Sequence, residues 1–233
     1  MANCERCTHN LCAKKVPIFS NLSRDELIEI IKMTGHREYK KGETIFLEGT
    51  DANTLYIINE GRIKLFKYTK DGKEQILHIL SNGDFFGELN LFKDGEYNFN
   101  AKAIMETKIC TLTKDKMKAI ILDKPEIGLK ILEVIGDRLS NVETLAQSLA
   151  TNDVEARIAK LLLDLKEEYG KEVLKGTSLK LPITKGDMSN YTGVARETIS
   201  RKLKKFEEEG IIELVGTKKI VIIDEEKLED YLF

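Results

Sequence analysis

The organisation of this chain follows from residues 181–212, which read LPITKGDMSNYTGVARETISRKLKKFEEEGII. Thr184 is followed three residues later by Asp187, and this pair predicts the capped start of a short helix. The Thr-Gly-Val sequence at residues 192–194 predicts a turn, and a second helix is expected over residues 195–208. Two short helices joined by a glycine-containing turn are typical of a helix-turn-helix.

The second of these helices has two chemically different faces. Ile199, Leu203 and Phe206 are spaced at i, i+4 and i+7, so they form an apolar face that can pack on a core. The opposite face carries side chains that suit base edges, and the candidate DNA-contacting residues are Arg196, Glu197, Thr198, Ser200, Arg201 and Lys204. The alternative is an ordinary amphipathic surface helix with a solvated charged face.

The chemistry of this face favours the DNA-binding interpretation. An arginine can donate two hydrogen bonds to guanine O6 and N7, and a glutamate can accept from cytosine N4. Each good bidentate pair discriminates against the wrong base by roughly 1–3 kcal/mol. Lys202, Lys204 and Lys205 are expected to add positive charge for phosphates.

Four cysteines form the second signal. Cys4, Cys7 and Cys12 have the spacing C-x2-C-x4-C, and Cys110 is the remaining cysteine of the chain. Thiols this dense can hold a soft metal ion or an iron–sulfur cluster. A four-cysteine zinc site has the same ligand count, and thiols that bind no metal are the third interpretation.

The residues before the helix-turn-helix predict a β-rich domain and a long helix. Between residues 16 and 124, glycines separate short strand-like segments, a pattern typical of an antiparallel sandwich or jelly roll. Residues 125–150 predict a long helix with apolar residues at spacings of three and four. The expected dimer interface consists of Leu132, Ile135, Leu139, Val142, Ala146 and Leu149. A helix buried within one subunit is the alternative.

The expected domain organisation therefore has four parts. These are a cysteine-rich segment (1–15), a β-roll sensor domain (16–124), a dimerisation helix (125–150) and a winged helix-turn-helix domain (151–233). The fold class is α+β. The wing is expected as a hairpin around Gly216, with Lys218 and Lys219 near phosphates.

Length and composition limit the number of domains and the classes of protein to which the chain can belong. A chain of 233 residues is long enough for two cores, and its formal net charge of −2 leaves the basic second helix as a local patch. The sequence has neither an apolar run long enough to span a membrane nor a signal-peptide core, so a cytoplasmic location is expected. An enzyme is not expected, because His9, His36 and His78 are scattered and no nucleophile–base pair is visible.

The stretch GVARETISRKL resembles the recognition helix of the CRP/FNR family of bacterial transcription regulators, and the resemblance extends over nearly the whole chain. In the CRP branch the readers match Arg196, Glu197 and Arg201. In the FNR branch they match Glu197, Ser200 and Arg201. The resemblance implies a homodimer that binds an inverted repeat with TTGAT-like or TGTGA-like half-sites, and RNA polymerase as a protein partner.

The resemblance also implies a cofactor. The FNR branch holds a [4Fe–4S] cluster with three N-terminal cysteines and one in the sensor domain, and Cys4, Cys7, Cys12 and Cys110 match that arrangement. The spacing between the second and third cysteines is four residues here, where the best-known members have five. The implied function is a regulator gated by a cluster that senses oxygen or redox state.

The cyclic-nucleotide site of the family is only partly present. Gly87, Glu88 and Leu89 match the loop that cradles the phosphate and ribose, but Asn98 and Phe99 stand where an arginine and a serine complete the site. The missing charge-assisted partner argues against cAMP as the ligand. Two alternatives to the iron–sulfur sensor are a regulator gated by a small organic effector in the β-roll, and a zinc-binding or redox interaction protein.

Overall fold

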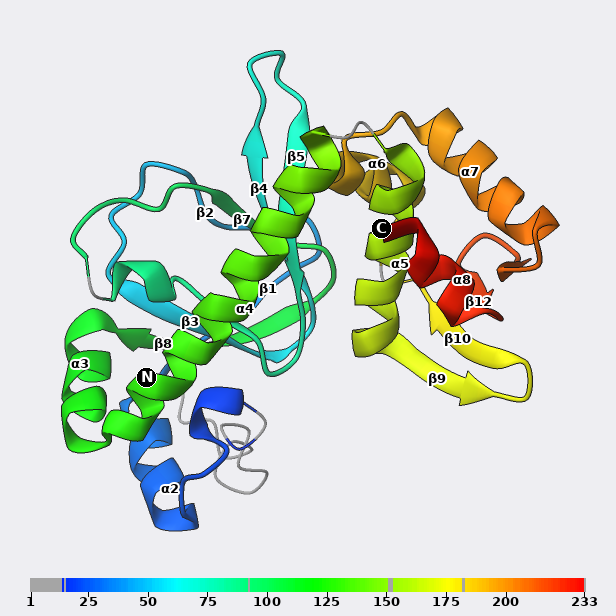
Figure 1. Ribbon diagram of the computed structural model, residues 1–233. Coiled ribbons are helices and arrows are strands. Elements are labelled where there is room, and N and C mark those ends of the chain that lie inside the picture. Colours follow the sequence, from blue (N-terminus) through cyan, green and yellow to red (C-terminus); the bar gives the residue numbers. More distant parts are fainter. Residues whose placement is uncertain (1–13, 15, 92, 151–152, 182, 233) are drawn as a thin grey trace. The chain divides into compact units, whose positions relative to one another are not determined.

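The computed structural model describes residues 14, 16–91, 93–150, 153–181 and 183–232 (Figure 1). The chain divides into two compact units, residues 1–138 and 139–233. The division falls inside the longest helix, α4 (Pro125–Ala150), and not at either end of it. The helix predicted over residues 125–150 is therefore one element that contributes to both units.

The described part of the first unit contains two four-stranded antiparallel sheets, with strand orders β1-β8-β3-β6 and β2-β7-β4-β5. This arrangement confirms the predicted β-roll and the α+β class. The strands are β1 (Gly35–Tyr39), β2 (Thr44–Phe46), β3 (Thr54–Glu60), β4 (Ile63–Tyr68), β5 (Glu74–Leu80), β6 (Phe85–Phe86), β7 (Asn100–Ala103) and β8 (Thr107–Thr113).

Helices cover one side of the roll and form its first core with the β1-β8-β3-β6 sheet (Figure 1). They are η2 (Pro17–Phe19), α2 (Arg24–Met33), α3 (Lys114–Asp123) and the beginning of α4. Ser23 and Glu26 form a capping box at the start of α2. Ile127 and Ile131 of α4 are buried in this core, so the long helix is anchored to the roll by its first turns.

The second unit contains the helix-turn-helix and a four-stranded sheet of order β11-β12-β10-β9. The predicted wing is confirmed as the β11–β12 hairpin. The hairpin of β9 and β10 was not predicted, because β9 is polar and largely exposed and Leu179 is the one large apolar residue of β10, so the two strands carry no apolar alternation. The elements are α5 (Val154–Tyr169), β9 (Gly170–Val173), β10 (Gly176–Lys180), α6 (Lys185–Thr192), α7 (Arg196–Glu208), β11 (Ile212–Val215), β12 (Lys219–Ile222), α8 (Glu225–Glu229) and η4 (Asp230–Leu232).

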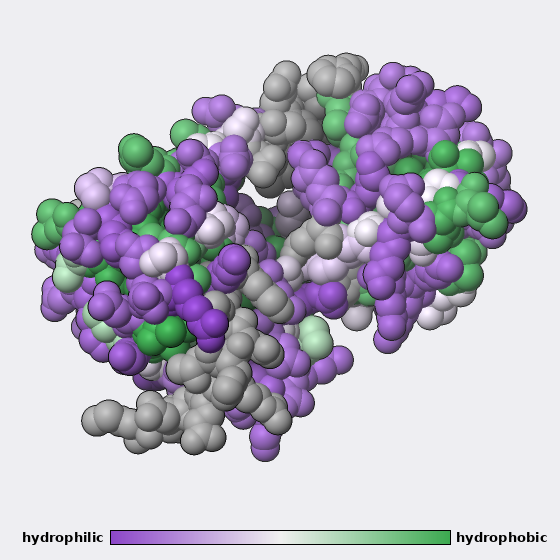
Figure 2. All heavy atoms as spheres, turned by 90° about the horizontal axis from the view of Figure 1, so that it is seen from below, coloured by the Kyte–Doolittle hydropathy of each residue, from purple (hydrophilic) through white to green (hydrophobic). Residues whose placement is uncertain are grey.

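The visible surface is mainly hydrophilic, with apolar side chains in small groups (Figure 2). Among the helices of the described residues, none combines the length and the hydropathy needed to cross a bilayer.

Candidate DNA-binding surface and sensor site

The turn between α6 and α7 is built from local hydrogen bonds. Thr184 caps α6, and its Oγ1 accepts the backbone N–H of Asp187 at 3.1 Å. Gly193 ends the helix in the left-handed region with φ of 68°, which glycine adopts at little cost. The Ser189 hydroxyl then donates to the carbonyl of Val194 at 2.6 Å. These contacts fix the angle at which the chain enters α7 and confirm the predicted helix-turn-helix.

Helix α7 has the two faces expected from its sequence. Ile199, Leu203 and Phe206 are fully buried. The candidate DNA-contacting residues lie on the other side: Arg196, Glu197, Arg201 and Lys204 are exposed, and Thr198 and Ser200 are half-buried. Their contacts with bases remain a prediction, but their exposure leaves them accessible to a DNA groove.

Two lysines of α7 differ from the sequence-based expectation. Lys202 and Lys205 were predicted to be phosphate contacts, yet both donate to Glu155 in the first turn of α5, at 2.6 and 2.8 Å. The two lysines hold the pKa of the Glu155 carboxyl below its usual range, Lys202 having the larger effect. Nothing in the sequence of residues 181–212 reveals this contact, because Glu155 lies about 50 positions earlier.

A buried arginine connects the start of α5 to the turn. Arg157 is only 9% exposed. Its Nη1 donates to the carbonyl of Thr192 at 2.8 Å, and its Nε donates to the carbonyl of Asp153 at 3.3 Å. The beginning of α5 and the helix-turn-helix are therefore held together by buried, charge-assisted hydrogen bonds.

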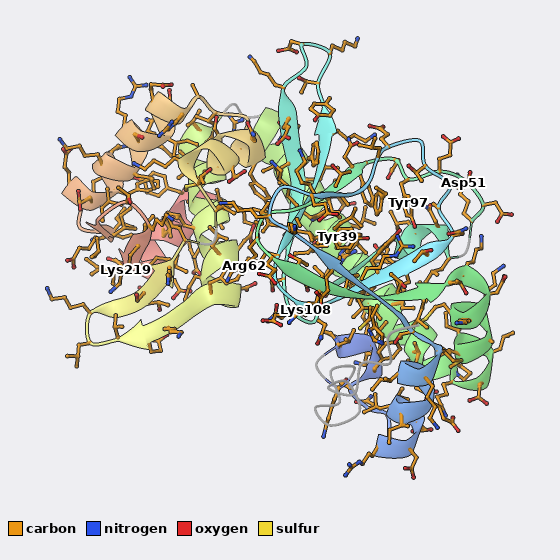
Figure 3. All side chains as sticks on the ribbon, turned by 180° about the vertical axis from the view of Figure 1, so that it is seen from behind. Tyr39, Asp51, Arg62, Tyr97, Lys108 and Lys219 are labelled. Atoms are coloured by element: carbon orange, nitrogen blue, oxygen red, sulfur yellow. The ribbon has the colours of Figure 1, made fainter. Side chains whose placement is uncertain are left out.

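The wing places further positive charge on the second unit. The β11–β12 hairpin turns at Gly216, which has φ of 65°. Lys218 and Lys219 are exposed beside this turn. Lys219 is labelled in Figure 3. Their predicted role near phosphates is compatible with that exposure.

The predicted dimer interface on α4 is partly accessible. Leu132, Leu139 and Val142 are 60%, 58% and 49% exposed, and Leu129, which the prediction did not include, is 63% exposed. Ile135 is half-buried and packs against the first core of the roll. The side chains of two further predicted positions, Ala146 and Leu149, lie outside the described residues.

The loop that resembles a phosphate cradle has a different partner. Gly87 has φ of 86°, and a Cβ there would lie 2.5 Å from the carbonyl oxygen of Thr54, so only glycine fits. Glu88 is 4% exposed and pairs with Arg138 of α4, whose Nη1 lies 2.6 Å from its Oε1. Arg138 also donates to the carbonyl of Phe85 at 2.6 Å. The carboxylate expected to hold a ribose is thus engaged within the protein.

Aromatic side chains fill the interior of the roll next to this loop. Phe46 stacks on Tyr97 with a centroid distance of 3.8 Å, and Tyr56 stacks on Phe86 at 4.9 Å. Phe99 packs beside Phe46 at 5.7 Å. Phe99 therefore belongs to the aromatic core, and it occupies the position of a polar residue in a nucleotide site.

Tyr39 and Tyr97 both belong to the roll (Figure 3), but they differ in their hydrogen bonding. The Tyr97 hydroxyl donates to the carbonyl of Thr54 at 2.8 Å. The Tyr39 hydroxyl is buried and has no hydrogen-bond partner among the described residues. A buried hydroxyl of this kind can accept a small polar guest or an ordered water.

His78 on β5 makes the stability of the roll depend on pH. Burial, aided by the charge of Arg138, lowers the pKa of His78 to about 4. Because the folded state binds the proton more weakly than the unfolded state, the stabilising contribution is complete above about pH 6.5 and is lost as the pH falls toward 4.

We expect wild-type protein to lose up to about 3 kcal/mol of unfolding free energy through His78 across this window. Urea unfolding at pH 7 and pH 4.5 should show a smaller loss for His78→Gln than for wild type. Equal losses in the two proteins would show that His78 does not titrate in this range.

Cys110 lies in the core under the first helices. It is 5% exposed on β8, between His36 of β1 and Ile57 of β3 in the sheet register. Its Sγ lies 3.4 Å from Nδ1 of His36. Cys110 shares one buried core with Phe19 and with the first turns of α4.

The chemistry of the thiols and the short chain between Cys12 and Phe19 are compatible with one metal site that Cys110 shares with the N-terminal cysteines. Phe19 and Cys110 line the same small cavity, of about 10 Å³. Cys12 precedes Phe19 by seven residues, a span of up to about 25 Å. Cys4, Cys7 and Cys12 lie outside the described residues, and no metal-binding group of three or more His, Cys, Asp or Glu is found within the described ones. The cavity holds about one water molecule, so the described residues alone do not enclose a cluster.

Each of the two units matches a known domain family. A cyclic nucleotide-binding domain family matches residues 36–124, and a Crp-like helix-turn-helix domain family matches residues 156–231. The CRP-like cAMP-activated global transcriptional regulator of Mycobacterium tuberculosis is 32% identical over 213 residues, covering 91% of this chain and 94% of that protein. The transcriptional activator protein FnrA of Stutzerimonas stutzeri is 25% identical, covering 96% of this chain and 89% of that protein.

The fold is shared with solved structures. FixK2 from Bradyrhizobium japonicum superposes with a TM-score of 0.75 at 24% identity, covering 85% of this chain and 96% of that one. A CooA mutant from Carboxydothermus hydrogenoformans superposes with a TM-score of 0.77 at 24% identity, covering 88% and 90%. This chain belongs to the CRP/FNR family and is a DNA-binding transcription regulator.

Proposed function

We propose that this regulator acts as a homodimer on an inverted-repeat operator and is gated by a [4Fe–4S] cluster held by Cys4, Cys7, Cys12 and Cys110. The observation that carries the proposal is the position of Cys110. It shares one buried core with Phe19, close in sequence to the other cysteines, and with Ile127 and Ile131 of α4. A change at this sulfur therefore acts on the same core that anchors the start of α4.

Cys4, Cys7, Cys12 and Cys110 would hold the cluster, which when bound would supply a centre that oxygen or nitric oxide can disassemble. The protein's own part is to bring the ligands together and to transmit their state. Cys110 is fixed by pairing of β8 with both β1 and β3. Val16, Ile18 and Phe19, which follow the cysteine-rich segment, pack on the same core as the first turns of α4, so the ligand set can influence the helix that joins two subunits.

The dimer is supported by the exposed apolar side chains of α4. Leu132 and Leu139 are seven positions apart, as in a coiled-coil seam, and Leu129 extends the row. Exposed leucines along one helix are costly in a monomer and are covered when two copies pair. A two-fold dimer presents two α7 helices to half-sites about one helical turn apart.

We further propose TTGAT-like or TGTGA-like half-sites, whose shared GA would be read by Arg201 and Glu197. RNA polymerase is the proposed protein partner, and no catalytic activity is proposed. An arginine can donate to guanine and a glutamate can accept from the paired cytosine, and both half-site types contain such a base pair. The exposure of Arg201 and Glu197 supports this assignment.

A small organic effector in the β-roll is the second candidate. It is favoured by the match to a cyclic nucleotide-binding domain and by the buried, unpartnered hydroxyl of Tyr39 among the described residues. cAMP itself is disfavoured. Glu88 is already paired with Arg138, and Phe99 packs in the aromatic core where an anion would need a polar partner. Thermal stabilisation of metal-free protein by added cAMP would contradict the argument against cAMP as the effector.

Cysteine variants test the ligand set. We expect Cys110→Ala to lose iron as severely as Cys7→Ala after anaerobic purification, because each would remove one of four iron–thiolate bonds. Thr111→Ala, the neighbouring position on β8, serves as the control and should keep its iron. Full iron content in Cys110→Ala would exclude Cys110 as a ligand. If the wild-type protein instead contains one zinc per chain, the four cysteines form a structural zinc site and not a cluster site.

A further inference from the structure

Glu155 brings one carboxylate oxygen between two lysines of the recognition helix. The Nζ atoms of Lys202 and Lys205 lie 2.6 and 2.8 Å from the same atom, Glu155 Oε1. The side chains are only partly exposed, at 18% for Glu155, 29% for Lys202 and 42% for Lys205. All three belong to the second unit, so the cluster is defined within one compact body.

The two lysines lie beside the base-reading face. Lys202 directly follows Arg201, and Lys205 directly follows the exposed Lys204. Lys205 also lies 3.6 Å from Glu209 and 5.8 Å from the centre of the Tyr231 ring. The ammonium groups are therefore close to the surface that meets DNA, but their charge is directed to carboxylates of the protein.

A carboxylate and a phosphate make the same demand on a lysine. Each offers an anionic oxygen that accepts a charge-assisted hydrogen bond of about 2.7–2.9 Å. The point where the two Nζ atoms converge is consequently suited to a phosphate oxygen, and Glu155 Oε1 now fills it.

We propose that Glu155 acts as an internal substitute for a DNA phosphate. It pairs with both Lys202 and Lys205 and, together with Glu209 at 3.6 Å from Lys205, offsets their two charges. It so weakens the attraction of the protein for DNA of any sequence, while the base-reading side chains stay uncovered. The inference rests on the proposed role of α7 as the helix that faces DNA. It gives Glu155 a role in setting the sequence-independent part of binding.

The expected size follows from counter-ion release. Each additional phosphate contact steepens the slope of log K against log salt by about 0.9 for duplex DNA. Removing the charge of Glu155 frees one lysine charge, because one carboxylate offsets one ammonium group. At 0.15 M salt, one extra contact corresponds to about a fivefold gain in affinity.

The test is Glu155→Gln, measured by fluorescence anisotropy on an unrelated duplex and on an inverted repeat of TTGAT half-sites, from 0.05 to 0.3 M salt. We expect the slope on the unrelated duplex to steepen by about one. Affinity for both duplexes should rise by the same factor, since the added contacts are to phosphates. Glu229→Gln is the matched control: it makes the same charge change at an exposed position of α8 and should give a smaller effect.

Further variants separate this idea from a structural role. Combining Glu155→Gln with Lys202→Met and Lys205→Met should return the slope to its wild-type value. The two lysine changes alone should leave the slope nearly unchanged, because those charges are already neutralised. A loss of about two in the slope from the lysine changes alone would overturn the proposal.

Weaker binding of both duplexes by a folded Glu155→Gln protein would also overturn it, and would leave Glu155 as a brace between α5 and α7. Arg201→Ala separates a failure of the proposed DNA-reading role of α7 from a failure of the proposal for Glu155. If Arg201→Ala does not alter operator binding, α7 is not the reading helix. If it does, and Glu155→Gln leaves the slope unchanged, only the phosphate-substitute proposal fails.

Discussion

Replacing Arg201 with alanine is expected to lower affinity for the operator by about 2–6 kcal/mol, roughly 30-fold or more. Arg201 is exposed on the face of α7 opposite the buried Leu203, and its guanidinium can donate two hydrogen bonds to one guanine. Each half-site loses about 1–3 kcal/mol, and a dimer loses this twice. Fold stability should change little, because the side chain is exposed.

Lys204→Ala is the control for this measurement, because it removes an exposed positive charge from the same face of α7. It should weaken binding to all duplexes by a similar factor, as expected of a phosphate contact. Arg201→Ala should instead relax selection at one base pair of each half-site in a set of single-base operator variants. A uniform loss over all sequences would show that Arg201 contacts phosphate and does not read a base.

Replacing Arg138 with methionine is expected to cost about 3–5 kcal/mol of stability in the first unit. Arg138 neutralises Glu88, whose carboxylate is 5% exposed, and also donates to the carbonyl of Phe85. Without the guanidinium, an ionised carboxylate stays buried with its charge uncompensated, which is far more costly than the pair is favourable. Calorimetric unfolding of the intact chain should show the transition of the roll at lower temperature.

The double variant Glu88→Gln with Arg138→Met should recover part of this loss, because it removes both charges. Glu88→Gln alone is expected to be milder than Arg138→Met, since the remaining guanidinium still donates to the carbonyl of Phe85. If Arg138→Met and the double variant are equally unstable, packing of the arginine and not its charge stabilises the loop.

The helix-turn-helix could be predicted from sequence because its determinants are local. Thr184 with Asp187 caps α6, Gly193 permits the turn, and the spacing of the buried α7 residues is fixed by helical geometry. The same holds for the capping box of α2. Each of these signals lies within a few residues of the element that it specifies.

The contacts that were missed connect distant segments. Arg138 pairs with Glu88 across 50 residues, and Lys205 pairs with Glu155 across 50 residues. A single charged residue in a sequence does not indicate its partner, so Glu88 was interpreted as part of a ligand loop and Lys205 as a phosphate contact. The role of Arg157 could not be predicted either, because it donates to two backbone carbonyls, and a backbone carbonyl leaves no signal in the sequence.

The most direct test of the gating proposal is analysis of anaerobically purified protein for iron, sulfide and zinc, together with operator binding before and after exposure to air. The account predicts about four irons and four sulfides per chain, as in one [4Fe–4S] centre, and operator affinity that changes when air bleaches the visible absorption. A colourless protein without iron that binds the operator equally before and after air exposure would contradict it.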